Sequence, residues 1–92
     1  MPKRVDANQK SIVAALRRLG ATILIMSDLG KGAPDIAVGW RGFNYFFELK
    51  DGSKPPSARK LTEAEEKFFC EWQGQVHIVY SVDDAVNYLK NL

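Results

Sequence analysis

Three charged residues interrupt otherwise apolar stretches of this sequence and could together do phosphoryl chemistry. Glu48 and Lys50 lie two positions apart at the end of an aromatic run, and Asp35 follows Pro34 at the start of an earlier apolar run. Side chains two apart on a strand point to the same face of a sheet. If the two runs form a hairpin, Asp35 comes to lie near Glu48. The pattern therefore predicts two carboxylates and an ammonium group in one place.

Such a group of charges is typical of a metal-assisted hydrolase. Two close carboxylates repel each other unless a cation neutralises them, and Mg²⁺ (or Mn²⁺) is the expected cofactor because it prefers oxygen ligands. The cation would polarise a phosphoryl oxygen and lower the pKa of a coordinated water, while Lys50 would hold the attacking water or hydroxide and the transition-state charge. The alternative is a surface Glu48–Lys50 pair worth under about 1 kcal/mol. The position of Asp35 favours the metal site.

A polar residue in the first helix is a further candidate for the site. Gln9 interrupts the apolar stripe of that helix, so its amide is expected to face the sheet. A buried amide needs a hydrogen-bond partner. Gln9 either bonds a backbone or cross-helix group or assists catalysis near the metal water, and Asn8 could take its place. Both interpretations stay open.

Basic residues lie near the candidate site along the chain. The net charge of +2 is unevenly distributed along the chain. Residues 1–60 contain 11 Lys and Arg and 5 Asp and Glu, whereas residues 61–92 contain 2 Lys and Arg and 6 Asp and Glu. An uneven charge of this size is most often a solvated surface, and the alternative is a surface that faces a polyanion. Contacts to phosphates give affinity without reading the base sequence, and the chain has no zinc module or recognition helix, so structure-selective cleavage of DNA is favoured. The expected DNA-binding residues are Lys31, Arg41, Lys54, Arg59 and Lys60.

The elements that must position these residues follow from periodicity and turn signals. The Arg41-Gly42 turn should fold the second strand onto the third, and a crossover helix should make the third and fourth strands parallel. We expect an α/β fold in the order α-β-β-β-α-β-α, with a four-stranded mixed sheet flanked by helices. The expected ranges are a helix from Asp6 or Ala7 to Gly20, strands at 21–26, 35–40 and 43–50, a helix from Thr62 to Gly74, a strand at 75–80, and a helix after Ser81.

The connection between the third strand and the second helix has its own signals. The two prolines in residues 51–60 predict an exposed loop without regular structure. Thr62 followed three positions later by Glu65 is a capping box, which gives Glu65 a structural role. The second helix is expected to bury four residues against the sheet: Leu61, Ala64, Phe68 and Trp72.

The overall composition bounds the class of protein. A chain of 92 residues predicts one domain, residues 1–92. A single cysteine and a single histidine exclude an intramolecular disulfide and a structural zinc site. No apolar run is long enough to span a bilayer, and the N-terminus lacks a secretory signal, so a reducing cytoplasm is the expected location.

The order of these motifs resembles a known nuclease family. Pro34-Asp35 followed by Glu48-Leu49-Lys50 is similar to the PD-(D/E)XK nuclease superfamily. A glycine loop before Asp35 and the hairpin setting resemble, in more detail, the virus-type replication-repair nuclease family (VRR-NUC) in its stand-alone phage or prophage form. The matching segments cover nearly the whole chain and are residues 5–9, 30–35, 48–52, 60–62 and 82–85.

The resemblance implies a restriction-endonuclease-like fold and a divalent-metal phosphodiesterase that acts on DNA. It implies Asp35, Glu48 and the Leu49 carbonyl as metal ligands and Lys50 as a catalytic residue. A glutamine that many members carry further along corresponds to Glu66.

The family and the size of the chain both suggest a homodimer. One small copy could grip a single duplex arm, whereas two copies would match the twofold symmetry of a four-way (Holliday) junction. The expected setting is a bacterial or phage-infected cell. The alternatives are a non-catalytic DNA-binding or scaffold subunit and a sequence-specific restriction-type nuclease.

Overall fold

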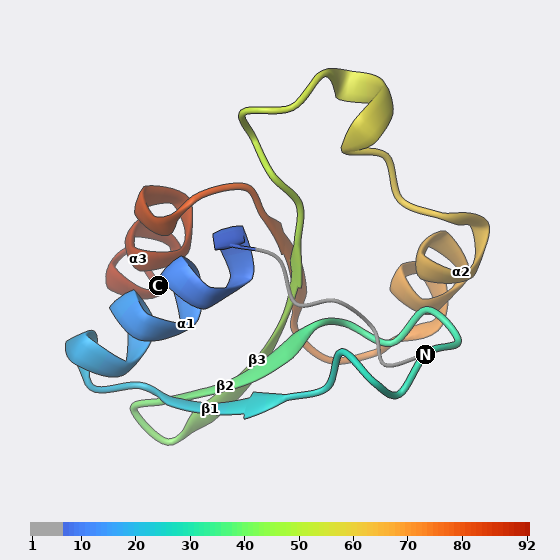
Figure 1. Ribbon diagram of the computed structural model, residues 1–92. Coiled ribbons are helices and arrows are strands. Elements are labelled where there is room, and N and C mark those ends of the chain that lie inside the picture. The colour runs from blue at the N-terminus through green and yellow to red at the C-terminus, as the bar shows by residue number, and fades with distance from the viewer. Residues whose placement is uncertain (1–6) are drawn as a thin grey trace.

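A computed structural model describes residues 7–92, and its elements follow the predicted order (Figure 1). Of the two predicted starts of the first helix, Ala7 is the one described, and Asp6 lies outside the described residues, as does Val5 of the matching segment 5–9. The predicted α/β class, hairpin and crossover are confirmed, and most boundaries move by one or two residues. The elements are α1 (Ala7–Leu19), β1 (Thr22–Ile25), β2 (Ile36–Trp40), β3 (Phe43–Leu49), α2 (Glu63–Glu71), β4 (Val76–Val79) and α3 (Val82–Lys90).

The four strands form one mixed sheet in the order β1-β2-β3-β4. β1 and β2 pair antiparallel, as do β2 and β3, whereas β3 and β4 pair parallel through the α2 crossover. The register pairs Ile36 with Phe47 across the hairpin and Glu48 with Ile78 across the parallel pair. The start of β2 and the end of β3 therefore lie at the same end of the sheet.

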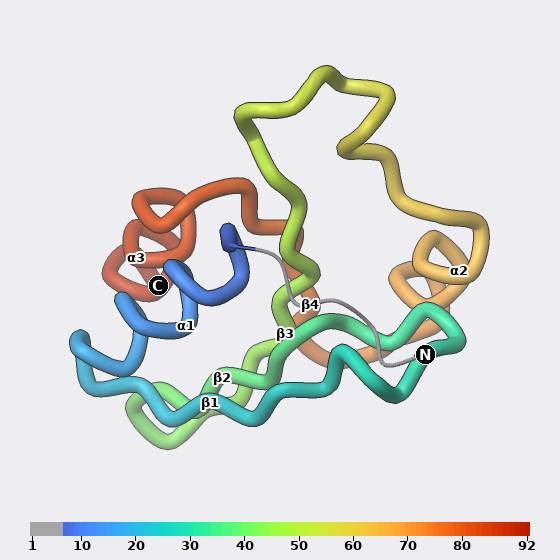
Figure 2. The backbone as a smooth tube through the Cα atoms, viewed as in Figure 1, coloured from blue at the N-terminus to red at the C-terminus, as the bar shows by residue number. Residues whose placement is uncertain are grey.

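One face of the sheet is covered by α1 and α3, which contact each other (Figures 1 and 2). The hydrophobic core lies between these helices and the sheet, where Ile12 and Leu16 of α1 and Leu89 of α3 are fully buried. The Tyr88 ring of α3 meets the Phe47 ring edge-on at a centroid distance of 5.5 Å. Tyr45 and Phe47 of β3 thus belong to the core, Leu49 packs against it, and the even-numbered residues of the strand point to the opposite face.

That opposite face is only partly covered by α2. The Trp72 ring packs on Phe46 of β3 at a centroid distance of 4.9 Å, and Phe68 lies 6.4 Å from the same ring. The expectation that α2 buries Leu61, Ala64, Phe68 and Trp72 is wrong: none of the α2 residues is buried, and Trp72 is 43% exposed. The helix also ends at Glu71, before Gly74, because the backbone of Trp72 is already extended (φ −72°, ψ 127°).

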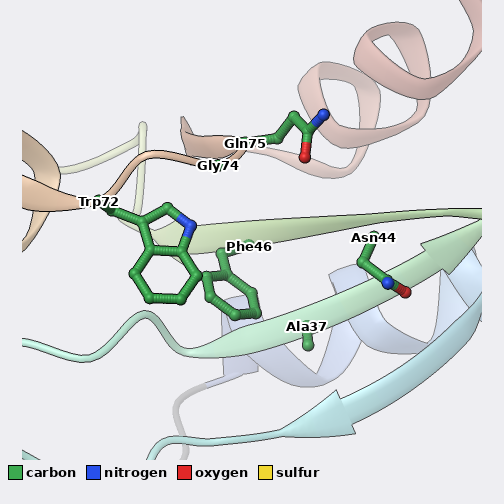
Figure 3. A pocket seen from close by; sticks show the side chains of 6 residues that line it. All are labelled: Ala37, Asn44, Phe46, Trp72, Gly74 and Gln75. Carbon is green, nitrogen blue, oxygen red and sulfur yellow. The ribbon is translucent and has the colours of Figure 1, made fainter.

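The uncovered part of this face holds a pocket. It has a volume of about 310 Å³ and lies where Trp72 leans over Phe46, with polar side chains at its margin (Figure 3). Its lining residues are Ala37, Asn44, Phe46, Trp72, Gly74 and Gln75. Asp35, Glu48 and Lys50 are not among them.

The long connection after β3 is more ordered than the two prolines suggested. Residues Pro56–Ala58 form a turn of 3₁₀ helix, so the expectation that this loop has no regular structure is wrong. The Arg59 guanidinium lies 5.9 Å above the centre of the Tyr80 ring, which ties the loop to the end of β4. No helix within residues 7–92 is long and apolar enough to cross a membrane.

Candidate active site

The two carboxylates predicted to converge lie at the same end of the β2–β3 hairpin. Asp35 immediately precedes β2 and is 7% exposed, and Glu48 lies near the end of β3 and is 2% exposed. The backbone N–H of Leu49 donates a hydrogen bond of 2.8 Å to Asp35 Oδ2. The N–H and C=O of one strand residue point to the same edge, so the Leu49 carbonyl also faces the Asp35 side of the strand.

The lysine predicted to complete the group reaches it from the same face of β3 as Glu48. Lys50 Nζ lies 3.9 Å from Glu48 Oε1, and it donates a hydrogen bond of 2.8 Å to Glu65 Oε1. The side chain of Lys50 is 15% exposed and that of Glu65 is 12% exposed. The ammonium group is therefore held among carboxylates instead of extending into solvent.

Glu65 is the site residue that sequence reasoning missed. The capping box was predicted, and both of its hydrogen bonds are present: Thr62 N–H donates to Glu65 Oε1 at 2.8 Å, and Glu65 N–H donates to Thr62 Oγ1 at 3.2 Å. The same Glu65 oxygen also accepts from Lys50. Glu66, which had been matched to the glutamine of the family, is exposed on the outside of α2.

The environment of Glu48 disfavours its charged form in the metal-free protein. Burial, hydrogen bonds to Glu65 and Asp35, and repulsion by these carboxylates together raise the pKa of Glu48 from 4.5 to about 10. Glu48 Oε2 is buried and has no hydrogen-bond partner within the described residues. Glu48 is thus a buried carboxyl group that favours its neutral form and has one oxygen without a hydrogen-bond partner within the described residues. A cation ligand is expected to have these properties when no cation is bound.

The pKa of Glu65 is shifted in the opposite direction, to a lower value. Its partial burial alone would raise its pKa, but hydrogen bonds to Glu48, Lys50 and the Thr62 backbone outweigh this effect, as does the charge of Lys50. The net result lowers the pKa of Glu65 to about 2. In the metal-free protein, these opposite shifts in pKa favour the charged form of Glu65 and the neutral form of Glu48.

The donor set fits a hard divalent cation held by few protein ligands. In the part of the chain that is described, no three His, Cys, Asp or Glu side chains are grouped so as to hold a metal ion alone. The ligands that the motif resemblance implies are the carboxylates of Asp35 and Glu48 and the Leu49 carbonyl. An all-oxygen set of two carboxylates and one carbonyl, with water at the other positions, matches the preference of Mg²⁺.

The two polar residues considered in the first helix both face the site end of the sheet. The side chain of Gln9 is buried and exchanges hydrogen bonds with Ser27: Gln9 Nε2 donates at 2.9 Å, and Ser27 Oγ donates to Gln9 Oε1 at 3.2 Å. Asn8 Nδ2 donates to the Lys50 carbonyl at 3.2 Å. These contacts give both amides structural partners next to the site, and a catalytic role for Gln9 stays a prediction.

Comparison with solved structures identifies the architecture that carries this site. A structure described as a VRR_NUC domain superposes with a TM-score of 0.60 and 28% sequence identity, and the match covers 89% of each chain. The chain has the VRR-NUC fold. No family model and no curated protein matches the sequence. The resemblance inferred from the motifs is thereby confirmed, and a VRR-NUC fold implies a nuclease of the PD-(D/E)XK type, a group that generally depends on metal ions.

Most of the basic residues assigned to DNA lie at the site end of the VRR-NUC sheet. Lys31 is exposed on the glycine loop that leads to Asp35, and Lys54 and Lys60 are exposed on the loop that follows Lys50. Arg59, on the same loop, is half-buried against Tyr80. All four therefore belong to the two loops that adjoin Asp35 and Lys50 in the chain.

Arg41 lies elsewhere, which corrects the expectation that it borders the site. It occupies the β2–β3 turn, at the end of the hairpin opposite Asp35, with its guanidinium 4.8 Å from the centre of the Trp40 ring. The five residues of β2 lie between it and Asp35, and six steps of extended chain span about 20 Å. Arg41 is close to Asp35 in sequence but not in space, because strand β2 separates the two residues and places them at opposite ends of the sheet.

Proposed function

We propose that this chain is a divalent-metal-dependent endonuclease, formed by a single domain of residues 1–92, that hydrolyses phosphodiester bonds in branched DNA. The observation that carries the proposal is the meeting of Asp35, Glu48 and Lys50 at one end of the hairpin. On the VRR-NUC fold, this arrangement places two carboxyl groups and one ammonium group at the same strand end. We expect Mg²⁺ or Mn²⁺ as the cofactor.

Each residue then has a definite task. Asp35, Glu48 and the Leu49 carbonyl would hold the cation, and Glu48 would release its carboxyl proton to solvent on becoming a ligand. A bound divalent cation supplies charge neutralisation and polarisation of a phosphoryl oxygen. Lys50 Nζ orients the attacking water by hydrogen bonding and stabilises the negative charge that develops on the phosphate.

The distribution of basic residues supports a substrate that is recognised by shape. Lys31, Lys54 and Lys60 are exposed on the two loops that adjoin Asp35 and Lys50 in the chain, which leaves them accessible to phosphates. Contacts to phosphates orient the nucleic acid without reading its bases. We therefore propose structure-selective cleavage, with a four-way junction as the preferred substrate.

The uncovered face of the sheet supports a homodimer. On this face, Leu24 of the edge strand β1 is 64% exposed and Trp72 is 43% exposed, although both are large apolar residues. With a radius of gyration of 12.6 Å, one copy offers a single site and limited surface for a junction. A twofold dimer would bury apolar surface and present two sites to opposed strands.

A cleavage panel with the purified protein tests this proposal. Labelled single-stranded, duplex, flap and four-way substrates are incubated with Mg²⁺ or Mn²⁺, with EDTA as the control, while light scattering gives the mass. We expect a dimer that nicks the four-way junction in preference to duplex. DNA binding without cutting would indicate a scaffold subunit, and cutting of duplex at one sequence would indicate a restriction-type enzyme. A species of only 10.3 kDa at micromolar concentration would contradict the dimer.

A further inference from the structure

One oxygen atom of Glu65 joins the candidate site to the start of α2. Glu65 Oε1 accepts a hydrogen bond from the Thr62 backbone N–H at 2.8 Å and another from Lys50 Nζ at 2.8 Å. The first of these contacts is ordinary helix capping. The second links the helix to a residue 15 positions earlier in the chain, so capping alone does not require it.

The contact with Glu65 determines where the Lys50 ammonium lies. A lysine side chain is flexible and has three donor hydrogens, so its position depends on the acceptors around it. Glu65 is the nearer of its two described carboxylate neighbours, at 2.8 Å against 3.9 Å for Glu48. Without the Glu65 oxygen, the ammonium group would be free to turn toward solvent.

The same turn of α2 also contacts the loop that delivers Asp35. Gly32 has a φ of +80°, and a Cβ atom built at this position would overlap the backbone carbonyl of Ala64. The glycine loop therefore packs directly on the first turn of α2. This turn touches both the segment that leads to Asp35 and the side chain of Lys50, so it is placed to fix their relative positions.

We propose that Glu65 is a positioning residue of the nuclease site, which holds the Lys50 ammonium in place by accepting its hydrogen bond at Oε1. This inference rests on the proposed function. Because the role needs an acceptor oxygen at this distance, glutamine fulfils it, whereas alanine does not. Aspartate keeps the charge, but its side chain is shorter by one methylene, so its carboxylate oxygen lies farther from Lys50 Nζ.

Five variants separate positioning from capping and from charge. E65A removes the oxygen, and E65Q retains an acceptor for both Lys50 and Thr62. T62A removes the hydroxyl that caps Glu65 N–H but leaves the Thr62 backbone donor and the Glu65 carboxylate in place. E66A is the matched control, since it removes the same charge from the neighbouring exposed position. E65D provides a second test of the missing oxygen if E65A does not fold.

The first measurement needs neither metal nor DNA. Brief acetylation of the metal-free protein, followed by peptide mass spectrometry, gives the labelling rate of Lys50 relative to exposed Lys67 as an internal standard. E65A and E65D should raise the Lys50 rate at least about threefold, and E65Q, T62A and E66A should not. An E65A or E65D protein in which Lys50 labels as slowly as in E66A overturns the inference, whether or not the wild type cuts DNA.

The second measurement is single-turnover cleavage of a four-way junction, below the melting temperature of each variant. E65A or E65D should lower the cleavage rate at least about tenfold with little change in DNA affinity, and E65Q should restore most of it. T62A should melt at lower temperature yet cut at nearly the wild-type rate. Equal rates in E65A and E66A, or equal losses in E65Q and E65A, overturn the inference. A wild type that does not cut with Mg²⁺ or Mn²⁺ contradicts the proposed function instead.

Discussion

Leu49 N–H donates a 2.8 Å hydrogen bond to Asp35 Oδ2, and this bond joins the two halves of the proposed nuclease motif. It holds the carboxylate that precedes β2 against the strand end that carries Glu48 and Lys50. The polypeptide alone therefore brings these groups together, and a cation would enter a site whose ligands are already close. Preorganisation of this kind lowers the cost of ordering ligands on binding.

The metal-free protein should lose stability as the pH rises. Glu48 keeps its proton in the folded state to a pKa of about 10 but loses it near 4.5 when unfolded, so between these values the folded state binds more protons. Its stabilising effect is complete below about pH 4.5 and declines steadily as the pH increases toward 10. Urea denaturation in EDTA between pH 5 and pH 9 measures this slope.

The variant E48Q should flatten that slope and be more stable than the wild type at pH 8, because a neutral amide needs no proton. E66Q is the matched control and should keep the wild-type slope, since Glu66 is exposed. A wild-type stability that is flat or rises over this range would show that Glu48 ionises freely in the folded protein.

The glycine loop offers a stability test with an internal control. Gly30 and Gly32 both have positive φ, at +68° and +80°, but a Cβ on Gly30 meets no atom within 4 Å, whereas one on Gly32 would overlap the Ala64 backbone. G30A should lower the free energy of unfolding by about 1 to 2 kcal/mol through backbone strain alone. G32A should lower it by at least about 1 kcal/mol more. Urea denaturation that finds the two variants equal would mean that the loop does not pack on α2.

The two loops that flank the site should dominate the salt dependence of DNA binding. The double variant K54A/K60A should reduce the slope of log affinity against log salt by up to about 2, as expected for the loss of two phosphate contacts. R41A, which changes the far end of the hairpin, should leave the slope unchanged. Fluorescence anisotropy with a labelled junction over 50 to 200 mM salt decides this, and a larger effect from R41A would place the DNA on the opposite end of the sheet.

Calcium should separate DNA binding from cleavage. Ca²⁺ takes the same oxygen ligands as Mg²⁺ but with longer, more variable coordination, which places the attacking water less well. We expect the junction to bind in Ca²⁺ with little cutting, as measured by anisotropy and by gel assay of the same samples. Efficient cutting in Ca²⁺ alone would show that the proposed geometry does not limit the reaction.

The fold could be predicted from local signals because those signals agree along the whole chain. The Arg41-Gly42 turn between two apolar runs specified the hairpin, and the run–helix–run pattern after it specified the parallel pair. Once the hairpin is assumed, the alternation of side chains along β3 puts Glu48 and Lys50 on one face. The end of the sheet at which they meet Asp35 follows from the same register.

Features that depend on long-range packing could not be predicted from the sequence. Glu65 reads as a local capping residue, and its contact with Lys50 depends on the path of the 51–62 loop. The apolar spacing of Phe68 and Trp72 suggested burial, yet α2 covers only part of its sheet face. The burial of Gln9 followed from its place in the stripe, but Ser27, its partner 18 residues away, did not.

The central claim is that Asp35, Glu48 and Lys50 form a metal-dependent nuclease site, and single-turnover cleavage of a labelled four-way junction tests it most directly. The wild type should cut in Mg²⁺ and not in EDTA. D35N, E48Q and K50A should each lower the rate at least about 100-fold while folding as well as the wild type. E66Q should cut at the wild-type rate. Unchanged cleavage in any one of the three site variants, or equal cutting in EDTA, would contradict the account.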